Sequence, residues 1–214
     1  MRVMTEQLTH NLRSDARENR DRVLDAARSL FAERGLDVTM RQIARRAGVG
    51  PATLYRRFPA KQLLVEEAFA QELQACVDIL AEGCDDPNPW RGFCSMIERM
   101  SVLTVRNQGF VDAFLANGRY DGAFAEHRRR LVPMLGDLAA RARAAGGLRA
   151  DFVLDDFVLI QLGARGLTGL PAEERERAAR RHAALVIESL RADRERGVLP
   201  TPAPLVRLVL QGCE

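Results

Sequence analysis

The sequence has few of the residues on which catalytic and metal sites are built. Its three histidines, His10, His127 and His182, have no second metal ligand three or four residues further along the chain. There is no Glu-x-x-His, no Gly-x-Ser-x-Gly motif and no phosphate-binding loop. The Gly-Val-Gly at 48–50 is not a nucleotide loop, since no strand pattern precedes it. These absences predict a protein that is not an enzyme, with no catalytic residue, no metal site and no cofactor.

Long apolar runs and paired cysteines are missing as well. No run of 18 uncharged apolar residues occurs, so we predict no membrane-spanning helix and no membrane partner. Residues 1–21 contain no apolar core of a signal peptide. The cysteines show no Cys-x-x-Cys spacing, which argues against a disulfide framework: Cys76, Cys84, Cys94 and Cys213. We therefore expect a cytoplasmic protein.

Lysine is nearly absent, and the basic residues are distributed unevenly. Lys61 is the single lysine, so almost every cation is an arginine. Residues 1–61 contain 13 Lys or Arg against 7 Asp or Glu, whereas the remainder contains 19 against 22. A basic first part on a slightly acidic body is typical of a protein whose first part faces a polyanion.

Strand patterns of useful length are absent, and helical periodicity takes their place. The first helix face is marked by apolar residues at helical spacing: Val23, Ala26, Ala27, Leu30 and Phe31. From such patterns, caps and prolines we predict helices over these ranges: 15–34, 40–47, 50–58, 61–81, 89–106, 109–117, 121–145, 155–168 and 171–194. Pro133 is expected to kink or break its helix. The predicted fold class is all-α.

Residues 39–61 combine chain breakers with arginines. Thr39 and Gln42 form a Thr-x-x-Gln capping box that starts the second helix. Ala44 is small enough for two helices to cross closely, and Gly48, four residues later, tolerates the positive φ of a tight turn. Apolar side chains around the turn are spaced to share one core: Leu30, Phe31, Ile43, Ala47, Val49, Leu54 and Phe58. This pattern predicts a helix-turn-helix.

The third helix begins at a proline and turns short, polar and basic side chains outward. They are Pro51, Ala52, Thr53, Tyr55, Arg56 and Arg57. Such side chains at the start of a helix suit entry into the major groove of DNA. Tyr55 can donate its hydroxyl to a phosphate, and Lys61 adds charge to the anion-attracting start of the fourth helix. We interpret this face as a DNA-binding surface.

Residues 22–69 resemble the N-terminal domain of the TetR (tetracycline-repressor-like) family of transcriptional regulators. In that family the third helix reads operator DNA, and a C-terminal helical domain dimerises and binds an effector. The resemblance implies that Thr39 and Tyr55 contact phosphates and that Lys61 clamps one. It places the following residues at the DNA: Thr39, Arg41, Gly50, Pro51, Ala52, Thr53, Tyr55, Arg56, Arg57 and Lys61.

Residues 50–60 contain the arginines that could read a DNA base and two departures from the family pattern. The resemblance implies that Arg56 or Arg57 reads guanine. Ala60 stands where the family often has a Ser, Asn or Asp cap, so the fourth helix starts less firmly. Gly50 leaves one base-contact position without a side chain.

The last two predicted helices carry apolar and small residues that suit close helix packing. We interpret them, as the resemblance implies, as half of a four-helix bundle between two subunits. The candidate dimer residues are Phe157, Ile160, Gly163, Ala164, Leu167, Ala179, His182, Ala183, Val186, Ile187 and Leu190. The alternative is that both helices are ordinary core within one chain.

Most of the remaining aromatic and sulfur residues lie between residues 62 and 145. As a group they could line a mainly apolar effector pocket, although core packing explains most of them individually. The candidates are Trp90, Phe93, Met96, Ile97, Met100, Phe110, Phe114, Phe124, His127 and Met134. Besides His127, three residues are candidate polar anchors: Arg106, Asp112 and Tyr120.

These patterns predict an N-terminal helix-turn-helix domain over 1–61, an effector-binding and dimerisation bundle over 62–196, and a tail over 197–214 of unknown role. The expected function is that of a homodimeric, sequence-specific repressor, released from a near-palindromic operator by a small ligand. One alternative is an architectural or ligand-independent DNA-binding protein, although this would favour a basic body. A protein-interaction module is a further rival, which would leave the exposed Tyr55 and Arg56 without a purpose.

Overall fold

The computed structural model describes residues 2–115, 122–192 and 199–210. These ranges are almost entirely helical and contain no strand, apart from one isolated bridge between Leu148 and Arg191. The chain forms two compact units, residues 1–69 and residues 70–214. The all-α fold class is confirmed.

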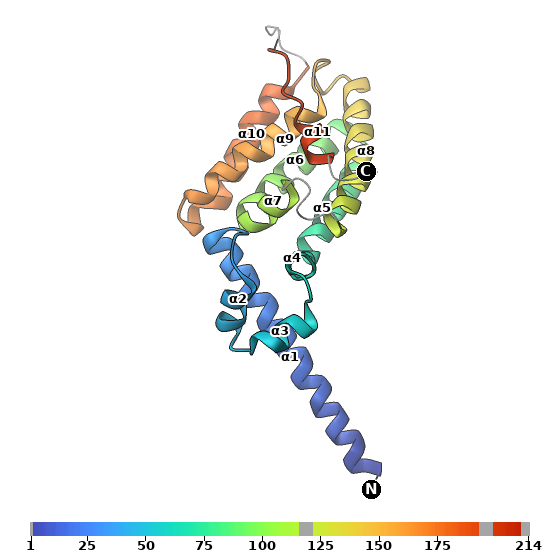
Figure 1. The fold of residues 1–214 in the computed structure, drawn as a ribbon. Helices are drawn as coiled ribbons and strands as arrows, with labels where there is room; N and C mark the ends of the chain where they lie inside the picture. Colours follow the sequence, from blue (N-terminus) through green and yellow to red (C-terminus); the bar gives the residue numbers. More distant parts are fainter. Residues whose placement is uncertain (1, 116–121, 193–198, 211–214) are drawn as a thin grey trace. The chain divides into compact units, whose positions relative to one another are not determined.

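The N-terminal unit is built from four helices (Figure 1). They are α1 (Arg2–Arg34), α2 (Met40–Ala47), α3 (Pro51–Arg57) and α4 (Lys61–Ala68). α1 starts earlier than the predicted residue 15, because no Gly or Pro interrupts the preceding segment. It ends before Gly35, whose φ of 69° is the left-handed conformation expected after a helix.

The predicted helix over 61–81 is interrupted at Phe69. This residue leaves helical geometry, with φ −109° and ψ 14°, and its buried ring packs on Phe31 with 5.7 Å between the ring centroids. α4 is also tied to α1, since the Nε–H of Arg28 donates to the carbonyl of Ala68 at 2.7 Å. The first unit therefore extends to residue 69, and the expected boundary after residue 61 lies too early.

The C-terminal unit is a helical bundle around α6 (Figure 1). Its helices are α5 (Ala70–Asp85), α6 (Pro89–Arg106), α7 (Gln108–Leu115), α8 (Ala123–Ala144), α9 (Leu154–Arg165), the 3-10 helix η1 (Gly166–Gly169), α10 (Ala172–Leu190) and α11 (Leu205–Leu210). Asn88 caps α6, because its side chain accepts a hydrogen bond from the N–H of Arg91 at 3.0 Å. α6 packs against α5, α8, α9 and α10.

Two glycines allow α5 and α6 to approach each other closely. A Cβ atom built on Gly92 would lie 2.1 Å from the carbonyl oxygen of Gly83, a distance that no real Cβ contact shows. The start of α6 can therefore reach the end of α5 only when position 92 has no side chain.

The structure is helical in two segments where the sequence left helix continuity open. α8 runs through Pro133 without a break, and since Arg129 and Pro133 are both exposed, solvent can bond the carbonyl that the proline leaves unpaired. The tail, for which no structure was predicted, contains α11, which contacts α9 and α8. No described helix is long and apolar enough to cross a membrane.

Candidate nucleic-acid interface and ligand cavity

The capping box at the start of α2 forms as predicted. The N–H of Gln42 donates to Thr39 Oγ1 at 3.3 Å, and the N–H of Thr39 donates to Gln42 Oε1 at 2.7 Å. Both otherwise unpaired donors at this helix end are thereby satisfied. This fixes where α2 begins and how it leaves the preceding loop.

The turn between α2 and α3 has the geometry that its sequence predicts. Gly48 adopts φ 67° and ψ 29°, in the left-handed region. Ala44 is fully buried, and its carbonyl accepts a hydrogen bond from the N–H of Val49 at 3.0 Å. The core predicted around the turn is buried except for the half-buried Val49: Leu30, Phe31, Ile43, Ala47, Leu54 and Phe58. Residues 40–57 therefore form a helix-turn-helix.

The residues predicted at the DNA lie mainly on the surface of this unit. The exposed ones are Thr39, Arg41, Gly50, Pro51, Ala52, Thr53, Tyr55, Arg56 and Arg57. Tyr55 is large and apolar in part, yet 46% of its surface is exposed. Lys61 is half-buried, and its ammonium group donates to the carbonyl of Leu36.

The first turns of α3 and α4 have no side-chain cap. Gly50 has no side chain with which to cap α3, and Ala60 makes no cap hydrogen bond at α4. The missing cap at Ala60 agrees with what its sequence implies. Helix starts carry partial positive charge and unpaired N–H groups, so both ends favour an anion.

The arginines of the helix-turn-helix differ from those of the C-terminal unit in their ion pairs. Four exposed arginines form no ion pair with any residue that the structure describes: Arg41, Arg45, Arg56 and Arg57. In the C-terminal unit, by contrast, many arginines face carboxylates, as in the pairs Arg99–Glu82, Arg106–Glu176, Arg165–Asp112 and Arg180–Glu98. The positive charge around α3 is therefore not neutralised locally.

Comparison with known proteins agrees with this geometry. The bacterial regulatory proteins of the tetR family match residues 23–68. A TetR transcriptional regulator from Streptomyces coelicolor is 30% identical, with a TM-score of 0.53, over 82% of this chain and 99% of that chain. The chain belongs to the TetR family.

Two further relatives support the assignment to the TetR family. A TetR regulatory protein from Mycobacterium vanbaalenii is 31% identical, with a TM-score of 0.50, over 84% of this chain and 99% of that chain. A helix-turn-helix-type transcriptional regulator of Staphylococcus aureus (strain USA300) is 36% identical over 76 residues, which are 35% of this chain and 41% of that protein. The chain thus spans less than half the length of this curated relative.

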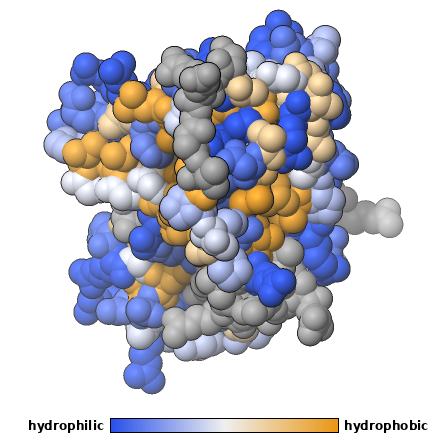
Figure 2. All heavy atoms as spheres, turned by 90° about the horizontal axis from the view of Figure 1, so that it is seen from above, coloured by the Kyte–Doolittle hydropathy of each residue, from blue (hydrophilic) through white to orange (hydrophobic). Residues whose placement is uncertain are grey.

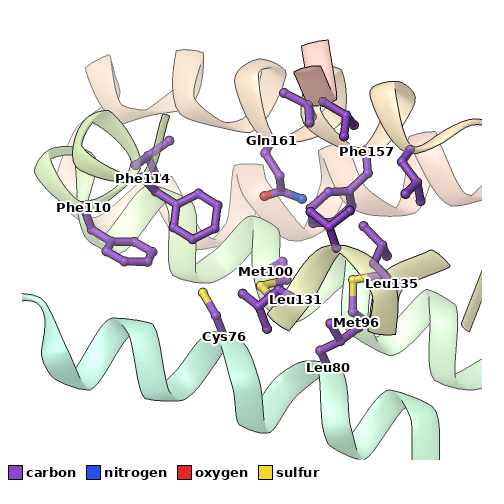
Figure 3. A pocket seen from close by; sticks show the side chains of 15 residues that line it. Cys76, Leu80, Met96, Met100, Phe110, Phe114, Leu131, Leu135, Phe157 and Gln161 are labelled. Carbon is purple, nitrogen blue, oxygen red and sulfur yellow. The ribbon is translucent and has the colours of Figure 1, made fainter. Parts of the chain in front are cut away.

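The C-terminal unit contains a cavity of about 110 Å³ between six helices (Figure 3). α5, α6, α7, α8, α9 and α11 contribute side chains to its wall. The lining residues are Cys76, Leu80, Met96, Met100, Phe110, Val111, Phe114, Leu131, Val132, Leu135, Leu154, Phe157, Val158, Gln161 and Val206. The wall is thus almost wholly apolar, which is typical of a small-molecule site.

Four of the ten pocket candidates line this cavity: Met96, Met100, Phe110 and Phe114. Six do not: Trp90, Phe93, Ile97, Phe124, His127 and Met134. Phe93 is fully buried between Trp90 and Phe152, with ring centroids 6.0 Å and 5.4 Å away. His127 Nδ1 lies 2.9 Å from the carbonyl oxygen of Ala123 in its own helix. Phe124 packs behind the wall, against the lining residues Phe110 and Phe114, with ring centroids 6.2 Å and 6.4 Å away.

The other candidate polar anchors do not reach the cavity either. Arg106 is bound by Glu176, with 2.6 Å between Nε and Oε1, and Asp112 is bound by Arg165 at 2.6 Å. Tyr120 lies outside the described residues. The polar side chain that does reach the wall is Gln161, which the sequence analysis missed. The sequence does contain a pattern that could have identified it: Gln161 follows Phe157 by one helical turn on an otherwise apolar helix face.

The thiol of Cys76 also lines the cavity and is held neutral. Burial first, and the nearby Glu72 second, raise the pKa of Cys76 to about 12. Cys76 therefore presents an uncharged, weakly polar group to the cavity at neutral pH.

The candidate dimer residues on α9 and α10 divide between two faces. Five are buried within the single chain: Ile160, Ala164, Ala179, Ala183 and Leu190. Ala179 packs against Val102 and Val105 of α6. Phe157 lines the cavity, Gly163 is exposed, and the rest are half-buried: Leu167, His182, Val186 and Ile187. The predicted stripe therefore largely faces the core of its own subunit.

A different set of apolar side chains on the same helices is exposed. Leu159 and Leu162 of α9 and Leu185 of α10 have 60%, 38% and 59% of their surface exposed. Leu170, between the two helices, is 38% exposed. Figure 2 shows patches of hydrophobic side chains among hydrophilic ones on one face of the molecule. None of these exposed leucines was among the candidate dimer residues chosen from the periodicity of the sequence.

Proposed function

We propose that this TetR-family protein is a sequence-specific transcriptional regulator that binds operator DNA through α3. The observation that carries the proposal is the group of exposed arginines without ion pairs on a helix-turn-helix, Arg41, Arg45, Arg56 and Arg57. Cations that face no carboxylate are available to DNA phosphates and to the acceptor edge of guanine.

The roles of the individual residues follow from their places on the unit. Arg56 and Arg57 lie on exposed positions of the helix that would enter the major groove, where an arginine can bind guanine O6 and N7 together. Thr39 and Tyr55 would contact phosphates, which position the protein without reading sequence. Lys61 would clamp a further phosphate beside the uncapped start of α4.

We infer that two copies bind together through the exposed leucines of α9 and α10. Exposed apolar residues gathered on one face often mark a protein contact. A two-fold dimer would present two copies of α3, and it would therefore bind a near-palindromic operator. Repression is the simplest outcome of such binding where the operator overlaps a promoter.

We also infer that a small, mainly apolar ligand occupies the cavity and releases the DNA. A ligand shifts an equilibrium only if it binds one state better than the other. The ligand would favour dimers in which the two α3 helices no longer match successive grooves. An architectural DNA-binding protein would have no use for such a cavity.

Fluorescence-anisotropy titration with DNA from upstream of the gene tests the proposal. We expect tight binding that survives competitor DNA and weakens steeply with salt. Arg56→Ala should weaken binding about tenfold, because one bidentate base contact contributes on the order of 1–3 kcal/mol. The control is Arg177→Ala, since Arg177 is an exposed arginine of α10 paired with Glu174.

The outcome is decided by the two variants together. Equal weakening by both would mean that only net charge matters, as expected for an architectural DNA-binding protein. No effect of either, with weak and competitor-sensitive binding by the wild type, would contradict the proposed reading helix.

A further inference from the structure

The side-chain amide of Gln161 enters the apolar cavity, and its NH₂ group has no hydrogen-bond partner among the described residues. Figure 3 shows this amide pointing from α9 into the space beside Met100. Its Oε1 accepts a hydrogen bond from the hydroxyl of Thr104 at 2.9 Å. Its Nε2 is buried and has no hydrogen-bond partner among the residues that the structure describes.

An unpaired amide NH₂ inside an apolar cavity needs a partner that the wall does not supply. The other lining residues are aliphatic, aromatic or sulfur-containing, and none of the fifteen is charged. A water molecule is stable in such a place only when it finds two or more polar partners. The missing partner is therefore a hydrogen-bond acceptor on a molecule that otherwise prefers apolar surroundings.

Size and charge restrict that molecule further. The cavity volume of about 110 Å³ is close to that of engineered apolar cavities, about 150 Å³, that bind benzene. A carboxylate or ammonium group inside would find no counter-ion in the wall, and the thiol of Cys76 stays neutral. These limits favour a neutral ligand about the size of one aromatic ring.

We propose that the cavity binds a neutral, ring-sized, mainly apolar molecule carrying a carbonyl or ether oxygen that accepts a hydrogen bond from Gln161 Nε2. The term effector for this molecule rests on the function proposed above, whereas its binding does not. Thr104 acts as a positioning residue, because its hydroxyl holds Oε1 and so turns Nε2 toward the ligand.

Three probes of similar size and shape test the proposal: acetophenone, isopropylbenzene and benzoate. Acetophenone offers a neutral acceptor, isopropylbenzene offers none, and benzoate carries a charge. Their dissociation constants are measured by calorimetry on the full-length protein without DNA. The matched variant is Gln161→Met, which keeps the length of the side chain and removes the amide.

The readout is the preference for acetophenone over isopropylbenzene, compared between the two proteins. We expect this preference to fall about tenfold in Gln161→Met, the effect of one net hydrogen bond. Benzoate should bind the wild type more weakly than acetophenone does. In wild-type NMR spectra, acetophenone but not isopropylbenzene should shift the side-chain NH₂ signal of Gln161, a readout that holds even if the variant does not fold.

Several results would overturn the proposal. They are an unchanged preference in the variant, tighter binding of benzoate than of acetophenone, an unshifted Gln161 signal, or no binding of any probe by the folded wild type. DNA binding is measured separately by anisotropy. A protein that binds DNA but none of the probes would refute the ligand chemistry alone, and one that binds acetophenone but no DNA would refute the regulator.

Discussion

Whether an arginine is available to a polyanion depends on the carboxylates that it already faces. Arg46, at the end of α2, is held by Glu33 at 2.5 Å, whereas Arg56 and Arg57 on α3 face no acidic partner in the described part of the chain. Exposed ion pairs contribute little to stability, but they neutralise charge locally. The pattern of pairing therefore locates the proposed DNA contact more closely than the net charge of residues 1–61 does.

The two thiols of α5 should differ in reactivity. The pKa of Cys76 is raised from 9.0 to about 12, mainly by burial, and the pKa of Cys84 is also raised by burial but less. Because the thiolate is the reactive form, alkylation of folded Cys76 at pH 8.5 should be about a thousandfold slower than in the unfolded chain. Peptide mapping by mass spectrometry should find Cys84, which is more exposed, labelled first.

The same shift sets the sign of a pH effect on stability. A folded pKa above the unfolded value stabilises the protein fully below pH 9, and this contribution is lost as pH rises toward 12. The free energy of unfolding of the wild type should therefore fall above pH 9, whereas that of Cys76→Ala lacks this thiol contribution. The difference between the two proteins, measured by chemical denaturation, should shrink as the pH rises above 9. Labelling of Cys76 as fast as Cys84 would show that the cavity wall opens more readily than its burial indicates.

At the scale of elements, the contact between α5 and α6 depends on a missing side chain. Gly92→Ala would place a Cβ atom 2.1 Å from the carbonyl oxygen of Gly83, so the two helices must separate. We expect the free energy of unfolding to fall by about 2 kcal/mol or more, as in overpacked cores. Chemical denaturation followed by circular dichroism measures this.

Gly136→Ala in α8 is the matched control for that substitution. Its Cβ would meet Leu154 at an ordinary 3.9 Å, so the helix propensity of alanine should raise stability by about 0.5 kcal/mol. A similar loss of stability in both variants would mean that α6 and α8 tolerate no added methyl group. The loss in Gly92→Ala could then not be assigned to the close approach at Gly92.

Local signals predicted the elements better than they predicted which way the elements face. The capping box of Thr39 and the turn at Gly48 are written in neighbouring residues, so both could be read from the sequence. The break at Phe69 arises because its ring packs on Phe31, a contact that no local pattern reveals. Ala164 and Ala183 belong to helices with apolar residues on two faces, and only packing decides which face is inside.

The wall of the candidate cavity also could not be predicted fully from local sequence patterns. Phe110 and Phe114 were identified as aromatic residues on one helix, but the wall also needs Leu131 and Leu135 of α8 and Val206 of α11. Val206 lies in a tail that three prolines, Pro200, Pro202 and Pro204, make hard to assign from the sequence. α11 is held in place partly because the N–H of Val206 donates to Asp155 at 2.8 Å, a contact between residues far apart in the chain.

At the scale of the whole molecule, the exposed leucines of α9 and α10 predict a homodimer. Leu185→Glu should place a charge in the proposed contact and shift the protein from dimer to monomer, because burying an unpaired carboxylate is costly. Sedimentation-velocity ultracentrifugation at micromolar concentration measures the mass. Leu63→Glu is the control, since Leu63 of α4 is 47% exposed but lies in the other unit.

The two variants separate a specific contact from a general loss of apolar surface. Monomers in both cases would indicate that the second substitution disturbs folding or that the contact lies elsewhere. An unchanged dimer in Leu185→Glu would contradict the assignment of the α9 and α10 leucines to the interface.

We propose that this TetR-family protein reads a particular DNA sequence with two copies of α3. The decisive experiment is selection from a pool of random double-stranded DNA by the wild-type protein, because no operator has to be assumed. We expect enrichment of one motif built from two inverted half-sites, and Arg56→Ala should relax the preference at a guanine within each half-site. Enrichment of no motif, or of a single half-site without its inverted copy, would show that the protein does not read a palindromic operator with two copies of α3.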